Sequence, residues 1–157
     1  MKALPFLAFT SVAAATAATA AYASVSLTLP IWAMFLGWVA YFTRGHSFVD
    51  GAVNLACLVL GLGFGMGAAV SLSVLVPALG TLAFAVVVFV VASIVVSLRA
   101  LPPFNNVLAY FLGLIGFFAA HAEPTLADFS ELAASGTLGS VAAWASQRMQ
   151  SRLVPAH

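Results

Sequence analysis

The fold of this chain is decided by the stretch Phe35-Leu36-Gly37-Trp38-Val39-Ala40-Tyr41-Phe42. A related stretch occurs later, as Phe111-Leu112-Gly113-Leu114-Ile115-Gly116-Phe117-Phe118. In both copies Phe-Leu-Gly is followed by a large residue, a β-branched residue, a small residue and two aromatic residues. Each copy comes a few residues after a Leu-Pro pair, Leu29-Pro30 or Leu101-Pro102. We therefore interpret the chain as two related halves built around this pair.

The composition indicates a membrane protein. The 157 residues are 64% hydrophobic and only 6% charged, and the mean hydropathy is +1.14, whereas about 25% of the residues of a soluble domain are charged. Such a chain cannot cover a water-facing surface, so we expect the lipid bilayer as its surroundings. The single cysteine, Cys57, excludes an internal disulfide and a multi-cysteine metal site. There is no basic patch for nucleic acid.

The length allows one integral membrane domain, residues 1–157, of six spanning helices. Proline, glycine or charged residues separate six apolar segments, at about residues 3–26, 30–43, 48–76, 78–98, 105–120 and 125–149. Pro77 is the predicted boundary between the third and the fourth. The first segment has two interpretations. It is a retained helix with small residues for close packing, or a secretory signal with Ala21-Tyr22-Ala23 as the cleavage site.

The positions of the basic residues support six helices. If the N-terminus is cytoplasmic, all of them fall on the cytoplasmic side: Lys2, Arg44, Arg99, Arg148 and Arg152. This is the positive-inside pattern without an exception, and five helices would break it. We therefore expect both termini in the cytoplasm.

The two halves, about residues 3–76 and 78–150, each contain three of the six segments. An odd number of crossings makes the second half enter the membrane from the opposite face. The prediction is an all-α polytopic protein with an inverted three-plus-three repeat, a form found in transporters that bind solute between the repeats. The alternative is chance, because apolar helices draw on few residue types and Phe-Leu-Gly can recur without a repeat.

Glycines mark the expected helix contacts. Gly37 and Gly113 are candidates for a close crossing of the second and fifth helices. The third helix contains a series at every second position, Gly61, Gly63, Gly65 and Gly67, which favours close approach of helix backbones. The alternative is a thin helix wall beside a permeation path. The series lies in an apolar helix without a preceding strand, so we do not interpret it as a dinucleotide fingerprint.

Five residues are candidates for lining a pore or binding a solute: Asn54, Asn105, Asn106, Trp38 and Phe35. An amide at membrane depth needs a polar partner, so Asn54 faces protein or water. Its other interpretation is a structural bond between helices. Asn105 and Asn106 follow two prolines at the start of the fifth helix, where capping the helix is the alternative to a pathway mouth. For Trp38 and Phe35 the alternative to an aromatic constriction is packing.

Part of the sequence resembles a known family. The carrying motif is Trp32-Ala33-x-Phe35-Leu36-Gly37-x-x-Ala40-Tyr41-Phe42, followed by Gly51 and a glycine-rich helix, then Tyr110-Phe111-x-Gly113, Phe118-Ala119 and Gly136-x-x-Gly139. Over about residues 28–147 it resembles the small bacterial inner-membrane proteins known as domain of unknown function 1097. The resemblance implies a multi-pass inner-membrane location and no particular activity. The alanine-rich first helix and Asn105-Asn106 depart from the family pattern.

The function predicted from the residues is a channel or facilitator for a small neutral or weakly polar solute, and we expect it to form a homo-oligomer. The alternative is a non-transporting scaffold or small subunit of a membrane complex. No catalytic constellation, metal-ligand spacing or phosphate loop occurs in the sequence, so we expect no enzyme activity and no cofactor. A continuous cavity between the halves, lined by Asn54, Trp38 and Asn105, would favour the channel, whereas a closed interior would favour the scaffold.

Overall fold

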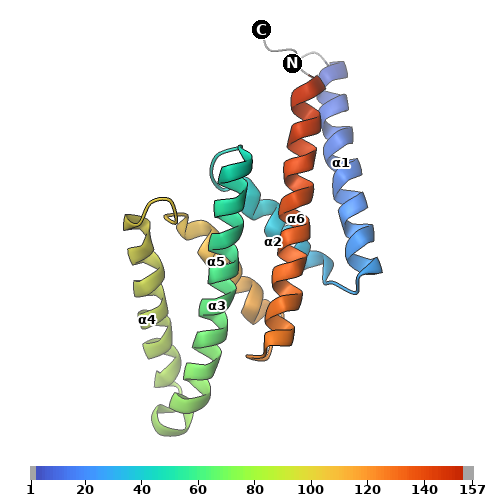
Figure 1. The fold of residues 1–157 in the computed structure, drawn as a ribbon. Helices are drawn as coiled ribbons and strands as arrows, with labels where there is room; N and C mark the ends of the chain where they lie inside the picture. Colours follow the sequence, from blue (N-terminus) through green and yellow to red (C-terminus); the bar gives the residue numbers. More distant parts are fainter. Residues whose placement is uncertain (1–2, 154–157) are drawn as a thin grey trace.

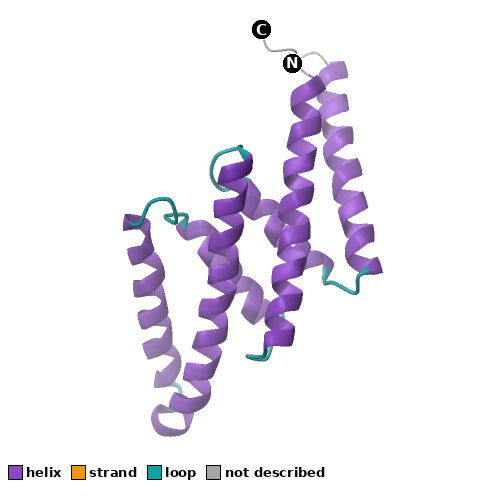
Figure 2. Ribbon diagram, viewed as in Figure 1, coloured by secondary structure: helices purple, strands orange, loops and turns teal. Residues whose placement is uncertain are grey.

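The computed structural model describes residues 3–153, and this part of the chain is entirely helical, as predicted (Figures 1 and 2). Its elements are α1 (Ala3–Ser26), α2 (Ile31–Tyr41), α3 (Phe48–Leu79), α4 (Leu82–Ser97), the 3₁₀ turn η1 (Leu98–Ala100), α5 (Val107–Ala119) and α6 (Leu126–Leu153). Lys2, which entered the charge argument, lies outside the described residues.

Length and polarity divide the described helices into three groups. Three helices are long and apolar enough to cross a membrane, over Phe6–Ser26, Phe48–Leu79 and Leu82–Ala100. Helices α2 and α5 are apolar but have only 11 and 13 residues. At 1.5 Å per residue they reach about 16 to 20 Å, against about 30 Å of bilayer hydrocarbon. Helix α6 has 28 residues but is more polar. The long apolar helices are compatible with a membrane protein.

The two short helices lie at the centre of the molecule. In Figure 1, α1 and α6 stand side by side at one flank, the α3–α4 hairpin forms the other, and α2 and α5 run obliquely between them. Helix α2 packs most extensively against α6, and α5 packs most extensively against α3. The α2–α3 and α4–α5 turns lie on the same side of the molecule as the C-terminal end of α6 (Figure 1). We call this side the basic end and the opposite side, with Glu123, Asp128 and Glu131, the acidic end.

Glycines set the closest contacts between the short helices and the long ones. Gly37 of α2 lies against the Gly136 backbone of α6, and Gly113 of α5 lies against the Leu58 carbonyl of α3. A Cβ at either glycine would overlap a backbone carbonyl of the facing helix. Gly37 and Gly113 thus occupy equivalent places, because each short helix uses its glycine to approach a long helix.

The boundary at Pro77 was wrong. Helix α3 continues through Pro77 to Leu79 and ends at Gly80, whose φ of +55° lies in the left-handed region that glycine adopts without strain. The Gly80 N–H donates to the Val76 carbonyl at 2.9 Å. Pro77 has no N–H to donate to the Ser73 carbonyl four residues earlier, so the helix loses one hydrogen bond there and continues for two more residues.

Helix α5 starts two residues later than predicted, since Asn106 precedes it as the N-terminal cap. Its side-chain oxygen accepts from the Ala109 N–H at 3.3 Å. Elsewhere the predicted and observed ends differ by no more than a few residues, and the largest extension is α6, which continues to Leu153.

Two groups of buried residues fill the middle of the molecule. One group joins α2, α3, α5 and α6 and consists of Ala33, Ala40, Leu58, Leu62, Phe117 and Leu132. The other joins α3, α4 and α5 and consists of Cys57, Val95, Ala109, Tyr110 and Leu114. The space around the two short helices is therefore occupied by packed side chains and backbone.

Candidate functional site

Asn54 lies in a fully bonded polar cluster at the basic end. Its side chain is 0% exposed, and its amide nitrogen donates to the carbonyls of Tyr41 at 3.1 Å and Arg44 at 2.7 Å. Its amide oxygen accepts from the Asn106 side chain at 2.7 Å. Both ends of the amide are thus used in holding the α2–α3 turn and the start of α5 against α3.

Asn106 and Asn105 extend the same cluster. The Asn106 amide also donates to the Thr43 hydroxyl at 2.6 Å, while Asn105 accepts from the Arg44 guanidinium. Arg44 donates as well to the Pro103 carbonyl at 2.9 Å. We call Asn54, Asn105, Asn106, Thr43 and Arg44 the amide network. The structure brings the three predicted asparagines together, in a clamp between two turns.

The two predicted aromatic residues lie on the outer side of α2. Phe35 is 41% exposed, and Trp38 is half-buried with its ring tilted against that of Phe42 at a centroid distance of 6.3 Å. Neither belongs to the amide network or to the cavity described below.

The glycine series of α3 divides between two faces of the helix. Gly61 and Gly65 are buried, the first against the Tyr110 carbonyl and the second against the Phe117 side chain, both on α5. A Cβ added at Gly63 would lie 4.0 Å from the Phe129 ring, and one added at Gly67 would meet open space. Residues four apart share a helix face, so only one alternate pair serves the α3–α5 contact.

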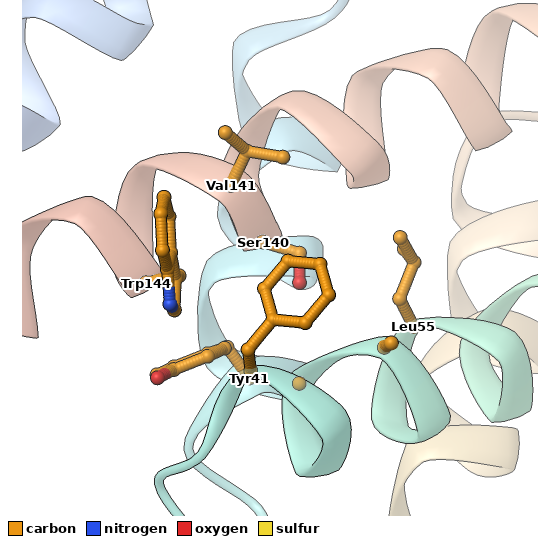
Figure 3. A pocket seen from close by; sticks show the side chains of 8 residues that line it. Tyr41, Leu55, Ser140, Val141 and Trp144 are labelled. Carbon is orange, nitrogen blue, oxygen red and sulfur yellow. The ribbon is translucent and has the colours of Figure 1, made fainter.

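A half-enclosed cavity of about 140 Å³ lies between α3 and α6 toward the basic end (Figure 3). Three helices supply its walls, which are Tyr41 of α2, Phe48, Gly51, Ala52 and Leu55 of α3, and Ser140, Val141 and Trp144 of α6. The rings of Phe48 and Trp144 meet edge to face across it, with centroids 5.7 Å apart. None of these residues was among the sequence candidates, although the glycine at position 51 is a signal for close approach.

Local structure holds the cavity in shape. The first turn of α3 is closed by a capping box, in which the Ser47 hydroxyl accepts from the Asp50 N–H at 3.0 Å and Asp50 accepts from the Ser47 N–H at 3.2 Å. The Tyr41 hydroxyl donates to the His46 carbonyl at 3.1 Å. The Tyr41 ring then lies directly on Gly51, where a Cβ would overlap it.

The walls of the cavity are apolar except for two groups. Ser140 is 5% exposed, and its hydroxyl points into the space between Tyr41, Leu55 and Trp144 (Figure 3). Among residues 3–153 neither this hydroxyl nor the Trp144 indole N–H has a hydrogen-bond partner. An apolar cavity with a few well-placed polar groups is the usual form of a small-molecule site.

A polar pocket of about 410 Å³ adjoins the cavity at the basic end. The two share three walls, Tyr41, Phe48 and Trp144. The other walls of the polar pocket are His46, Ser47, Gln147, Arg148 and Ser151. A molecule in the apolar cavity can therefore extend into a region with a positive charge and several hydrogen-bonding groups.

The acidic end has a separate pocket of about 270 Å³ between the start of α2, the end of α5 and the start of α6. It contains Asp128 and Glu131 beside Trp32. The Asp128 carboxylate is fixed at the start of α6, because it accepts hydrogen bonds from the Glu123 N–H at 2.8 Å and from the Thr125 hydroxyl at 3.1 Å.

One protein family, described as a protein of unknown function (DUF1097), matches residues 11–150. The chain belongs to the DUF1097 family. The match runs from α1 into the last turns of α6 and thus includes both short helices, the amide network and the cavity. Comparison with curated proteins and with solved structures found no match. For a DUF1097 protein the function must therefore be argued from the geometry.

Proposed function

We propose that this DUF1097 protein is a facilitator or channel of the bacterial inner membrane that binds a small, largely apolar solute in the cavity between α3 and α6. The chain crosses the membrane six times, with both termini in the cytoplasm and the two halves inverted. Its task is binding and passage of the solute, without a catalysed reaction.

Matched contacts support the inverted repeat. The residues that touch across α2 and α6 have counterparts that touch across α5 and α3, at a spacing of 76 residues for the short helices and 78 for the long ones. The paired contacts are Gly37 with Gly136 and Gly113 with Leu58, then Gly139 with Met34 and Gly61 with Tyr110. A chance recurrence of Phe-Leu-Gly would not reproduce these contacts in the same relative positions.

The helix starts support it as well. Ser47 and Asp50 cap α3, and Thr125 and Asp128, each 78 residues later, make the corresponding bonds at the start of α6. The two caps lie at opposite ends of the molecule (Figure 1), as an inverted arrangement requires.

The charges support the orientation. Arg44 and Arg99 lie in turns at the basic end, together with Arg148 and Arg152 in the final turns of α6 (Figure 1). Basic residues remain on the cytoplasmic side of membrane proteins. The basic end is accordingly the cytoplasmic one.

One observation carries the assignment of the solute site: the two halves differ at the cavity. Gly51 and its counterpart Phe129 are 78 residues apart. At the basic end Gly51 leaves the cavity open, whereas toward the acidic end the Phe129 ring packs near Gly63 against the buried group that contains Leu62 and Phe117. The position that Gly51 leaves open in one half is thus filled by a ring in the other, while the pocket of about 270 Å³ at the acidic end lies elsewhere, between α2, α5 and α6. A site between inverted repeats that differs in this way is accessible from one face.

The amide network does not serve as a pore lining in this proposal. Both N–H groups of Asn54 and one lone pair of its oxygen bond to protein groups, and the side chain is fully buried, so a passing solute does not reach it. Its role is to hold the turns at the basic end beside the cavity.

Two observations favour the scaffold function. The first is that Asn54, Trp38 and Asn105 do not line the cavity between α3 and α6, and that packed side chains fill the middle of the described molecule. The second is that helix α1 is scarcely buried and exposes the small residues Ser11, Ala15, Ala18 and Thr19. Small residues allow membrane helices to approach closely. This surface suits contact with a second copy or another membrane protein, and it supports the homo-oligomer that we propose as the working form.

The test is uptake of a panel of small solutes by proteoliposomes that contain the protein. We expect Ser140→Leu to lower the initial rate about tenfold, because a leucine side chain at position 140 fills the cavity. Leucine is the residue at the matching position of the other half, Leu62. Ser140→Ala, which leaves the space open, retains most of the rate.

Ser73→Leu is the matched control, since Ser73 is exposed on α3 and its hydroxyl bonds only within the helix. Equal uptake rates for Ser140→Leu and Ser73→Leu would show that the solute does not pass through the cavity. Absence of uptake for every solute would leave the scaffold as the function.

A further inference from the structure

We propose that the solute is a small amphipathic anion, with an apolar group of about ring size in the cavity and a carboxylate at Arg148. This inference rests on the proposed function, because it assigns a chemical class to the molecule that the cavity holds. It is carried by the size of the cavity, by its junction with the polar pocket and by the charge found there.

The cavity limits the size of the apolar group. Its volume is about 140 Å³, and a protein cavity of roughly 150 Å³ with apolar walls binds benzene. One aromatic ring or a short branched hydrocarbon group fits this space. The 16 or so carbons of a lipid acyl chain do not.

The junction with the polar pocket sets the direction of the solute. Tyr41, Phe48 and Trp144 border both spaces, so a group attached to a ring in the cavity reaches the polar pocket past these aromatic side chains. The polar pocket faces the cytoplasmic end, and the solute would therefore enter with its apolar group first.

The charge of the polar pocket favours an anion. Arg148 belongs to its wall, and within the described chain its guanidinium forms no ion pair and no side-chain hydrogen bond. No carboxylate is part of this wall. The Asp50 carboxylate, at the start of α3, accepts a hydrogen bond from the Ser47 hydroxyl at 2.6 Å. An arginine without a protein partner is well suited to a carboxylate, which it binds through two parallel hydrogen bonds.

Gln147 adds a second group. Its side-chain oxygen is buried and has no hydrogen-bond partner within residues 3–153. Gln147 belongs to the wall of the polar pocket, and a side-chain amide carries N–H donors as well as an oxygen. Arg148 in the same wall supplies the positive charge for an anionic head.

Two sources supply this chemistry: an organic acid dissolved in the cytoplasm, or the headgroup of an anionic phospholipid with its chain in the cavity. The volume of the cavity favours the dissolved acid. Both are included in the experiment.

Binding is measured through the fluorescence of Trp144, with Trp32 and Trp38 replaced by phenylalanine so that Trp144 is the single tryptophan. The protein is placed in nanodiscs of phosphatidylcholine. The probes are phenylacetate and phenylacetamide, which share the ring and differ in the charge of the head. We compare Arg148→Gln with Arg152→Gln, which removes the same charge one turn further along α6 and outside the pocket wall.

We expect saturable quenching by phenylacetate in the parent and in Arg152→Gln. In Arg148→Gln the affinity for phenylacetate falls about tenfold, because a charge-assisted pair is lost, while phenylacetamide binds as in the parent. Ser140→Leu abolishes the quenching by both probes.

Equal phenylacetate affinity in Arg148→Gln and Arg152→Gln would overturn the anion assignment, and the loss of phenylacetamide binding in Ser140→Leu would still support the cavity as a solute site. Quenching that Ser140→Leu leaves unchanged would overturn both. Displacement of phenylacetate by phosphatidylglycerol in the nanodisc, with an effect that depends on Arg148, would identify a lipid site and overturn the dissolved acid as the ligand.

Discussion

Asn54 illustrates what a single polar residue requires at membrane depth. An amide surrounded by hydrocarbon must bond to protein or to water, and here three hydrogen bonds join it to Tyr41, Arg44 and Asn106. The sequence identified the requirement. It did not identify the partners, because two of them are backbone carbonyls of a turn that only the packing of α2 on α3 brings into reach.

Replacing this amide should destabilise the protein. In Asn54→Leu two carbonyls and the Asn106 amide lose their partner while they remain buried, and we expect a loss of about 2 kcal/mol of folding free energy. Thermal unfolding in detergent, followed by circular dichroism, measures the change.

The matched control is Asn105→Leu, since Asn105 is exposed and belongs to the same network. Its melting temperature should fall much less. If both variants melt at the same temperature, burial of the Asn54 bonds does not contribute to stability.

At the scale of the elements, two short helices are each fitted into the backbone of a long one. Helix α2 lies against α6 through Gly37 and Gly139, and α5 lies against α3 through Gly113 and Gly61. Without a hydrophobic force between helices in lipid, association depends on close packing. Helices of 11 and 13 residues cannot span the bilayer alone, so these contacts hold them in place.

A methyl group at one of these contacts should separate the helices. In Gly37→Ala the Cβ overlaps the Gly136 carbonyl, and backbone cannot move aside as a flexible side chain can. We expect a large fall in melting temperature and in the yield of monodisperse protein, measured by size-exclusion chromatography after heating.

Gly67→Ala is the control, because nothing lies within 4 Å of the position where its Cβ would be. It should melt at or above the parent temperature, since alanine favours a helix by up to about 1 kcal/mol over glycine. Equal melting of the two variants would show that the α2–α6 contact tolerates a wider separation.

At the scale of the whole molecule, the arrangement has two ends of different chemistry. The amide network, the cavity and the polar pocket lie toward the basic end, and Asp128 and Glu131 line the pocket at the other. The halves correspond in their contacts and differ in what fills the space near the ends, where Gly51 and Phe129 occupy matching positions. This difference between the halves makes the two ends of the molecule distinct.

The orientation predicts where the termini lie. A fluorescent protein fused after His157 should fluoresce, and alkaline phosphatase fused at the same residue should be inactive, because both report a cytoplasmic C-terminus. Fusions within the α5–α6 turn, at Glu123, should give the reverse. An active phosphatase after His157 would contradict the six-crossing arrangement.

Several features could be predicted from the residues before any fold was known. Composition and the apolar segments predicted an all-helical membrane protein, because a chain with 6% charged residues cannot cover a water-facing surface. The family membership was predicted from the motif around Gly37 and is confirmed by the match over residues 11–150.

Other features were decided only by the tertiary structure. A glycine indicates that a helix is approached closely, but not by which neighbour, and the contacts of Gly37 with α6 and of Gly113 with α3 were decided only by the folded chain. Pro77 removes a hydrogen bond, but the packing of α3 determines whether the helix stops there. The cavity needed Tyr41, Leu55 and Ser140 from three helices. The repeated stretch at residues 35–42 determines that α2 is a short apolar helix with a glycine for close contact. Only the folded chain, in which distant segments meet, decides that this contact is with α6 and that Tyr41 at the helix end closes a cavity.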